Sequence, residues 1–139
     1  MTKEIPLDPR LARDSVAVGT LALCEVRLQD DARFPWLVLV PQRAGVTELF
    51  ELAAADRATA MEEITRCAAA LRAVTQCLKI NVGALGNIVR QLHSHIVARN
   101  EGDAAWPGPV WGAGARLPYG EAEKADLIAR LRSALAMRG

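Results

Sequence analysis

The chain has 139 residues, of which 51% are hydrophobic, so it is long enough to bury the core of one ordinary domain. Its 17 basic and 16 acidic residues are interspersed and give a net charge of +1, which argues against a nucleic-acid partner but allows a small anionic ligand. No apolar run approaches the roughly 20 residues of a membrane span, and the N-terminal residues lack the apolar region of a signal peptide. We therefore expect a single cytoplasmic domain over residues 1–139.

The chain contains three cysteines, Cys24, Cys67 and Cys77, an odd number that leaves at least one thiol unpaired. If Cys67 and Cys77 share a helix, they lie roughly 15 Å apart along it, which is too far for a disulfide. We therefore predict reduced, buried thiols.

The N-terminal part of the chain is predicted to contain a short helix followed by strands. Asp8 and Pro9 form a pair typical of a helix N-cap and first turn, which indicates a helix over residues 7–14. Apolar and β-branched side chains dominate residues 15–28. This segment is predicted to form one strand, or two strands broken near Gly19.

A polar turn at residues 29–31 precedes a continuous apolar strand over residues 36–40, and the strands on either side of the turn are predicted to form an antiparallel hairpin. The period then changes to that of helices. Residues 47–52 resemble a short helical turn, and Asp56 is placed to cap a longer helix that lies across the sheet. The apolar positions of this helix are Met61, Ile64, Ala68, Leu71, Thr75 and Leu78.

The second half of the chain is predicted to contain another hairpin, a loop and a final helix. Residues 79–85 return to a strand pattern, residues 86–87 form a turn, and residues 88–99 make the next strand. Gly, Pro and Trp are frequent in residues 100–119, which indicates a loop. A last helix over residues 121–137 has acidic residues early and basic residues late, as the helix dipole favours.

Both histidines of the chain, His93 and His95, lie in the predicted strand over residues 88–99. Side chains alternate between the faces of a strand, so the histidines share one face with Gln91. The members of that face are Val89, Gln91, His93, His95 and Val97. The two imidazoles can converge on one tetrahedral anion, which predicts a phosphate site. A strand carbonyl that accepts Nδ1–H from His93 would aim its Nε2 outward as a nucleophile.

Two other interpretations of the histidine pair remain open. The histidines can simply be packed strand residues, since intermediate burial is common for histidine. They can also share a zinc or iron ion, which requires further ligands from Asp103 or another acidic residue. No cysteine pair or His-Glu motif lies nearby to supply these ligands.

The run over residues 88–99 resembles the signature of the histidine triad (HIT) family of nucleotide-binding hydrolases and transferases, in which histidines alternate with apolar residues. The strand ending in VLVP, the long helix, the NVGALGN segment and a tail with tryptophan and proline follow the order of that family. The resemblance covers residues 16–112 and leaves a loop and helix at residues 113–139. It implies an α+β fold with about five antiparallel strands, one long helix and a C-terminal helix, usually in a homodimer.

The resemblance implies roles for three polar residues of this run. His93 matches the middle histidine, which attacks the α-phosphorus in the family, and His95 matches the last, which holds phosphate oxygens. Gln91 replaces the first histidine, which is an orienting group, and Ser94 stands where an apolar residue is usual. An amide can donate and accept hydrogen bonds but cannot carry a proton. In this respect the chain resembles a bacterial branch of the family with glutamine at the first position.

The resemblance also implies contacts with a nucleotide. Asn87 stands where relatives have an amide that contacts the phosphate or the leaving group, although a turn residue that tolerates positive φ is an equal alternative. Asn81 resembles an asparagine at the edge of the nucleotide, and Asp30 matches an acidic residue that binds the ribose. Trp106 and Trp111 are interpreted either as closing over the pocket or as packing and dimer contacts.

The implied reaction is hydrolysis or nucleotidyl transfer at the α-phosphate of a nucleoside phosphoramidate or dinucleoside polyphosphate, through a phosphohistidine on His93. No cofactor or metal is expected, apart from a divalent cation that accompanies the substrate. The expected partners are a small nucleotide and a second copy of the chain. The rival interpretation is a regulatory nucleotide-binding module without turnover, because Gln91 replaces the first histidine.

Overall fold

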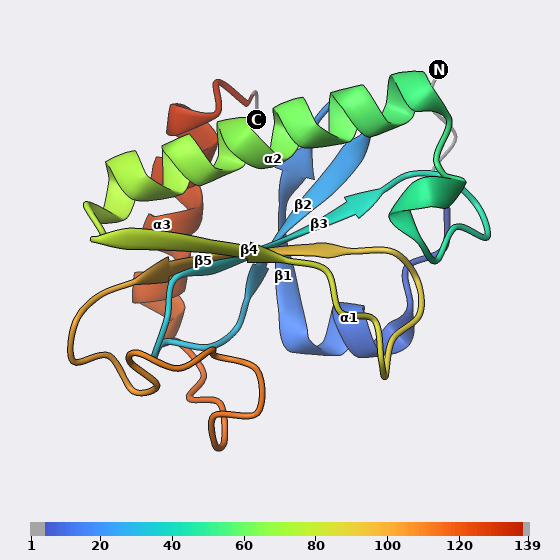
Figure 1. Ribbon diagram of the computed structural model, residues 1–139. Coiled ribbons are helices and arrows are strands. Elements are labelled where there is room, and N and C mark those ends of the chain that lie inside the picture. Colours follow the sequence, from blue (N-terminus) through green and yellow to red (C-terminus); the bar gives the residue numbers. More distant parts are fainter. Residues whose placement is uncertain (1–4, 138–139) are drawn as a thin grey trace.

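Five antiparallel strands form one sheet in the order β1-β2-β3-β5-β4 (Figure 1). Their bounds are β1 Ser15–Thr20, β2 Cys24–Gln29, β3 Trp36–Pro41, β4 Lys79–Gly83 and β5 Ser94–Arg99. The computed structural model describes residues 5–137. The expected α+β class with an antiparallel sheet is confirmed. The segment over residues 15–28 contains two strands, whose pairing is irregular between Ala17 and Gly19.

Helices cover both faces of this sheet. Their bounds are α1 Pro9–Asp14, the 3-10 turn η1 Leu49–Glu51, α2 Ala54–Thr75 and α3 Glu121–Ala134. The long helix α2 lies across one face, whereas α1 and the loop after β5 lie toward the other face (Figure 1). No helix within residues 5–137 is long and apolar enough to cross a membrane.

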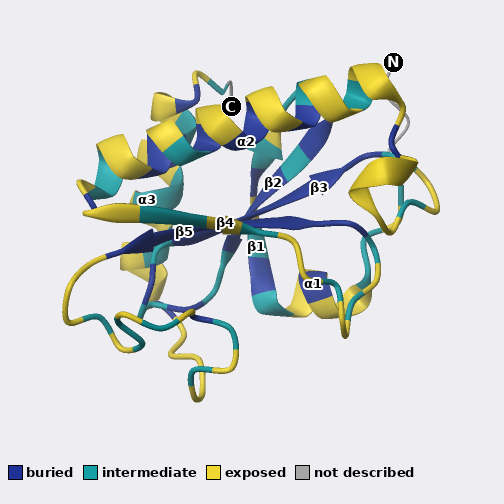
Figure 2. Cartoon of the chain, in the orientation of Figure 1, coloured by how far each residue is buried: buried dark blue, intermediate teal, exposed yellow. Residues whose placement is uncertain are grey.

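The central strand β3 separates two apolar clusters. Its side chains alternate, so Leu37 and Leu39 belong to the cluster beneath α2, while Val38 and Val40 belong to the opposite cluster. Every residue of β3 is buried because both faces are covered (Figure 2). In the neighbouring strand β5, His95 pairs with Val38. This register places His95 on the sheet face away from α2.

The ends of α2 differ from those predicted. The helix begins at Ala54 rather than after a cap at Asp56, whose carboxylate instead accepts hydrogen bonds from Arg43 at 2.7 and 3.0 Å. It ends at Thr75, because the following residue, Gln76, has a left-handed φ of 54° that stops the helix. Leu78 therefore lies beyond the helix and is 52% exposed.

The buried stripe of α2 is shifted from the predicted one. Ile64 and Leu71 are buried as predicted, but Met61 is 57% exposed. The prediction for Met61 is wrong because the helix turns its neighbour Ala60 toward the sheet. The buried residues of α2 are Ala60, Glu63, Ile64, Cys67, Ala70 and Leu71. The three cysteines are free and buried, as predicted.

The strand predicted over residues 88–99 is shorter than expected. It begins only at Ser94, and the preceding strand β4 already ends at Gly83. The tight turn predicted at residues 86–87 is therefore wrong, because residues 84–93 form a longer irregular connection between β4 and β5. The antiparallel pairing of these two strands is confirmed.

The connection departs from strand geometry because its polar groups bind partners outside the sheet. The main-chain N–H of Leu92 donates to Val46 O at 3.0 Å. The side chain of Gln91 binds the main chain of the N-terminal segment instead of extending along a strand face. His93 thus lies just before β5, whereas His95 lies inside it.

Arg99, at the end of β5, carries a charge that is almost fully enclosed, because the residue is 1% exposed. Its guanidinium donates to both carboxylate oxygens of Asp103 at 2.8 and 3.0 Å and to Asn81 Oδ1 at 2.8 Å. The side-chain hydrogen bond from Arg99 is the main cause that lowers the pKa of Asp103 to about 2. The pair therefore stays charged inside the fold.

Asp103→Ala would leave the Arg99 guanidinium buried without its charged partner. We expect it to lower the free energy of unfolding by about 3 to 5 kcal/mol, measured by urea denaturation. The matched control is Asp14→Ala, which breaks the more exposed pair with Arg13 and is expected to cost less than about 1 kcal/mol. Equal losses in the two variants would contradict this account of Arg99.

Candidate active site

His93 and His95 meet on the sheet face opposite α2. Their ring centroids lie 4.8 Å apart and the ring planes are inclined by 74°. Both residues are buried. The backbone of His95 is fixed by pairing with Val38 on β3 and Gly83 on β4. The two imidazoles therefore converge, although only one of them comes from a strand.

Two hydrogen bonds give the histidines opposite tautomers. Nδ1 of His93 lies 2.7 Å from the main-chain oxygen of Gln91. A carbonyl only accepts, so His93 carries its proton on Nδ1 and a lone pair on Nε2. The indole Nε1–H of Trp36 donates to His95 Nδ1 at 3.0 Å. His95 therefore carries its proton on Nε2.

His95 is held in its neutral form. Burial, and to a smaller extent the neighbouring His93, lowers the pKa of His95 to about 3. The hydrogen bond from Trp36 acts in the same direction, because an indole only donates and needs an unprotonated Nδ1. His95 can thus donate a hydrogen bond from Nε2 over the physiological pH range without bearing a charge.

Both histidines line a cavity of about 400 Å³, a volume suited to a small-molecule ligand. Trp111, from the loop after β5, forms another part of the wall, with its ring centroid 5.4 Å from that of His95. Gly83 allows this approach, since a Cβ at that position would lie 3.2 Å from the indole. Trp36 completes the aromatic wall, with its ring centroid 6.4 Å from that of Trp111.

One end of the cavity is lined by Asp31 and Arg33. The carboxylate of Asp31 accepts hydrogen bonds from Arg33 Nε and Nη2 at 3.0 and 2.8 Å, and from the Leu117 N–H at 3.3 Å. These contacts occupy both oxygens of Asp31. The aspartate therefore fixes Arg33 and the C-terminal segment at the cavity rather than presenting a free carboxylate.

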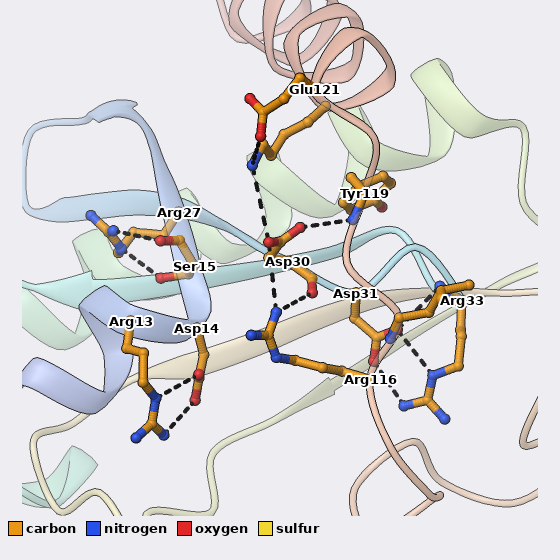
Figure 3. Close-up of polar contacts among 12 residues, drawn as sticks. Arg13, Asp14, Ser15, Arg27, Asp30, Asp31, Arg33, Arg116, Tyr119 and Glu121 are labelled. Atoms are coloured by element: carbon orange, nitrogen blue, oxygen red, sulfur yellow. Dashed lines mark hydrogen bonds and ion pairs between the residues drawn. The ribbon is translucent and has the colours of Figure 1, made fainter.

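The neighbouring Asp30 faces the C-terminal segment (Figure 3). Its Oδ1 accepts a hydrogen bond from the Tyr119 N–H at 3.0 Å, and its Oδ2 lies 3.6 Å from the Arg116 guanidinium. Arg116 itself lines the cavity. Asp30 thus fixes Arg116 at the cavity wall, whereas the family resemblance implies that it binds a ribose.

The structure brings four of the residues considered for the site to the cavity, namely His93, His95, Asn87 and Trp111. The side chain of Asn87 is exposed and has no hydrogen-bond partner within residues 5–137. Its amide is therefore available to a ligand. The cavity is also lined by Gln29, whose side chain likewise has no hydrogen-bond partner among the described residues.

The other predicted residues do not line the cavity. Gln91 turns its amide toward the N-terminal segment. Asn81 accepts a hydrogen bond from Arg99, and the indole of Trp106 lies 5.7 Å from the same guanidinium. Asn81 and Trp106 therefore surround the buried Arg99–Asp103 pair.

Trp36, Arg33 and Arg116 line the site without having been predicted from the sequence. Trp36 begins an apolar strand, and no local pattern distinguishes it from an ordinary core residue. Its contact with His95 depends on the pairing of β3 with β5. Arg116 is held by the distant carboxylate of Asp30, whereas Arg33 binds its sequence neighbour Asp31 and the main-chain oxygen of Ala113.

Comparison with known proteins identifies the class to which this fold and histidine pair belong. The model of the HIT domain family matches residues 10–102. The chain therefore belongs to the HIT domain family. A comparison with curated proteins gave no match.

Three solved structures share nearly the whole fold. A HIT protein from Sinorhizobium meliloti 1021 is 53% identical, over 93% of this chain and 96% of that chain, with a TM-score of 0.91. A histidine triad protein from Bradyrhizobium japonicum is 43% identical, over 96% and 99% of the two chains, with a TM-score of 0.93. One from Marinobacter aquaeolei VT8 is 38% identical, over 96% and 98%, also with a TM-score of 0.93.

Within residues 5–137, no three His, Cys, Asp or Glu side chains form a group that could hold a metal ion. Asp103, which the sequence offered as a candidate metal ligand, is paired with Arg99. The two histidines that line the cavity offer one lone pair, on His93 Nε2, and one N–H donor, on His95 Nε2.

Proposed function

We propose that the chain is a nucleotide hydrolase or nucleotidyl transferase that acts at the α-phosphate of a nucleoside phosphoramidate or dinucleoside polyphosphate. The observation that carries this proposal is the opposite tautomers of the two histidines. A phosphate between them would meet the Nε2 lone pair of His93 and the Nε2–H of His95. The first is a nucleophile, and the second stabilises charge on a phosphoryl oxygen.

The proposed reaction has two steps. His93 Nε2 forms a bond to the α-phosphorus while the bond from phosphorus to the leaving group breaks, and the leaving group takes the bonding electrons. A polyphosphate leaves as its anion, whereas the nitrogen of a phosphoramidate takes a proton from solvent and leaves as the amine. Water or another acceptor hydroxyl then attacks the same phosphorus and gives up a proton to solvent, the nitrogen–phosphorus bond breaks, and His93 regains its lone pair. Through both steps Nδ1–H stays bonded to the Gln91 carbonyl, which stabilises the positive charge on the substituted ring.

In this proposal the nucleoside lies against the aromatic wall of Trp36 and Trp111, and Asn87 contacts the phosphate or the leaving group. Asp30 holds Arg116 at the cavity wall, whereas Asn81 and Trp106 contact the buried Arg99. No cofactor takes part, and a divalent cation enters only with a polyphosphate substrate.

We assign the chain to a glutamine-bearing bacterial branch of the family and infer that it forms a homodimer. The edge strand β4 and helix α2 expose apolar side chains, including Val82 at 52% and Met61 at 57%. These are more exposed than Trp106 and Trp111, which are half-buried. The free edge of β4 and the outer face of α2 are therefore better candidates for the contact than the aromatic loop.

The test is rapid-quench kinetics with an adenosine phosphoramidate and a dinucleoside polyphosphate. We expect release of one leaving group per subunit, followed by continued turnover, with light scattering of the same sample giving twice the mass of one chain. Binding of the nucleoside monophosphate with no turnover would contradict the enzyme and identify the nucleotide-binding module instead.

A further inference from the structure

The N-terminal segment before α1 lies against the connection that carries His93. The main-chain N–H of Asp8 donates to Gln91 Oε1 at 2.8 Å, and Gln91 Nε2 donates to the main-chain oxygen of Pro6 at 3.1 Å. Both contacts join residues more than 80 positions apart in the chain. Residues 5–8 also precede the part matched by the HIT family model.

Gln91 therefore makes separate contacts through its side chain and its main chain. Its side chain binds the N-terminal segment, and its main-chain oxygen accepts Nδ1–H from His93 at 2.7 Å. The connection around it has no strand pairing. Close to Gln91, the described main chain is otherwise held by the hydrogen bond from Leu92 to Val46. The position of the carbonyl that selects the His93 tautomer thus depends on how firmly residue 91 is held.

We propose that Gln91 is a positioning residue whose amide, clamped by the main chain of Pro6 and Asp8, holds its own carbonyl in place to keep His93 with a free Nε2. The proposal rests on the proposed function in one respect, namely that this nitrogen attacks phosphorus. It differs from a phosphate-binding role, because the Gln91 amide is turned away from the cavity.

Glutamine suits this position for a chemical reason. The clamp needs one acceptor for the Asp8 N–H and one donor for the Pro6 oxygen, and an amide always offers both. An imidazole at residue 91 would lose its acceptor on protonation near its ordinary pKa of about 6.5. The clamp made by Gln91 is therefore independent of pH.

The test compares Gln91→Met with wild type in the full chain. Methionine has a similar length but makes neither hydrogen bond. The first readout is nitrogen-15 NMR of the imidazoles, which requires no substrate and reports which ring nitrogen carries the proton. We expect wild-type His93 to be protonated on Nδ1 and His95 on Nε2. In Gln91→Met, His93 should gain the Nε2–H tautomer while His95, held by Trp36, stays unchanged.

The second readout is steady-state kinetics on the substrate that wild type turns over. We expect kcat of Gln91→Met to fall about tenfold, which corresponds to the loss of one or two hydrogen bonds. KM should change less than about twofold. Gln91→Glu keeps the acceptor for Asp8 but presents an oxygen to Pro6, so its tautomer shift should be at least as large. It provides a second variant if Gln91→Met does not fold.

The matched control is Gln42→Met, because Gln42 Oε1 accepts a hydrogen bond from Ile5 of the same segment at 3.4 Å. Gln42 makes no contact with the Gln91 main-chain oxygen that binds His93, so this variant should keep the wild-type tautomer and kcat. Wild-type tautomers in both residue 91 variants would overturn the proposal, as would an equal shift in Gln42→Met. A tautomer shift specific to residue 91 in a protein without turnover would support the clamp and reject the proposed function.

Discussion

His93→Ala is expected to abolish turnover while leaving nucleotide binding largely intact. The imidazole Nε2 is the group placed to form the bond to phosphorus, and its loss should lower kcat by more than about 10⁴-fold, as removal of a nucleophile does in other covalent enzymes. The monophosphate would lose about one hydrogen-bonding neighbour, so its dissociation constant should rise less than about tenfold. Rapid-quench assays and calorimetric titration measure the two effects.

The structure explains why nucleotide binding should survive the loss of the His93 side chain. The cavity walls from Trp36, Trp111 and Asn87 do not depend on His93, so the ligand keeps most of its contacts. Turnover in His93→Ala at the wild-type rate would remove the covalent mechanism and leave direct attack by water. Loss of binding by several orders of magnitude would show that His93 mainly holds the ligand.

His95→Ala is expected to weaken both binding and turnover. His95 offers a neutral N–H to the phosphate, and a hydrogen bond to a charged group contributes about 1.5 to 3 kcal/mol, so each property should fall roughly 10- to 100-fold. Trp36→Phe is the matched comparison, because it keeps an aromatic ring but removes the donor to His95 Nδ1. It should give a smaller loss in the same direction. An unchanged phosphate affinity in His95→Ala would contradict this role.

The same histidine should give the fold a pH dependence. The pKa of His95 falls from 6.5 to about 3, chiefly through burial. Below pH 6.5 the unfolded chain therefore binds a proton that the folded chain does not, and stability falls as the pH drops from about 6.5 toward 3. Urea denaturation across this range should show a flatter profile for His95→Phe than for wild type. Parallel profiles would show that His95 is not held neutral by the fold.

Periodicity in the sequence predicted the strands and the long helix, whereas the five-stranded sheet followed from the resemblance to the HIT family. The two histidines meet as predicted, although His93 lies just before β5 and not in the strand. The strands could be predicted because their side chains alternate locally, as in β5, where every second side chain faces the same cluster. The predicted bounds of α2 were less accurate, because the helix is stopped by a left-handed conformation at Gln76 that the residue type does not predict.

The polar contacts of the site depend on distant partners and could not be predicted in this way. Gln91 leaves the strand geometry because Asp8 and Pro6 bind its amide. Asn81 turns toward Arg99, and Asp30 binds the segment before α3. In each case the residue type showed that the side chain needs a polar partner, but the tertiary fold determines which partner it has.

Intermediate trapping tests most directly whether His93 carries the nucleotidyl group. Wild-type protein is mixed with a substrate labelled in its nucleoside, quenched in base, digested and analysed by mass spectrometry. We expect a nucleotidyl adduct on the peptide at His93, appearing with the burst of leaving group and absent in His93→Ala. Because both histidines fall close together, fragmentation must assign the site. An adduct on His95, or a burst with no adduct, would contradict the account.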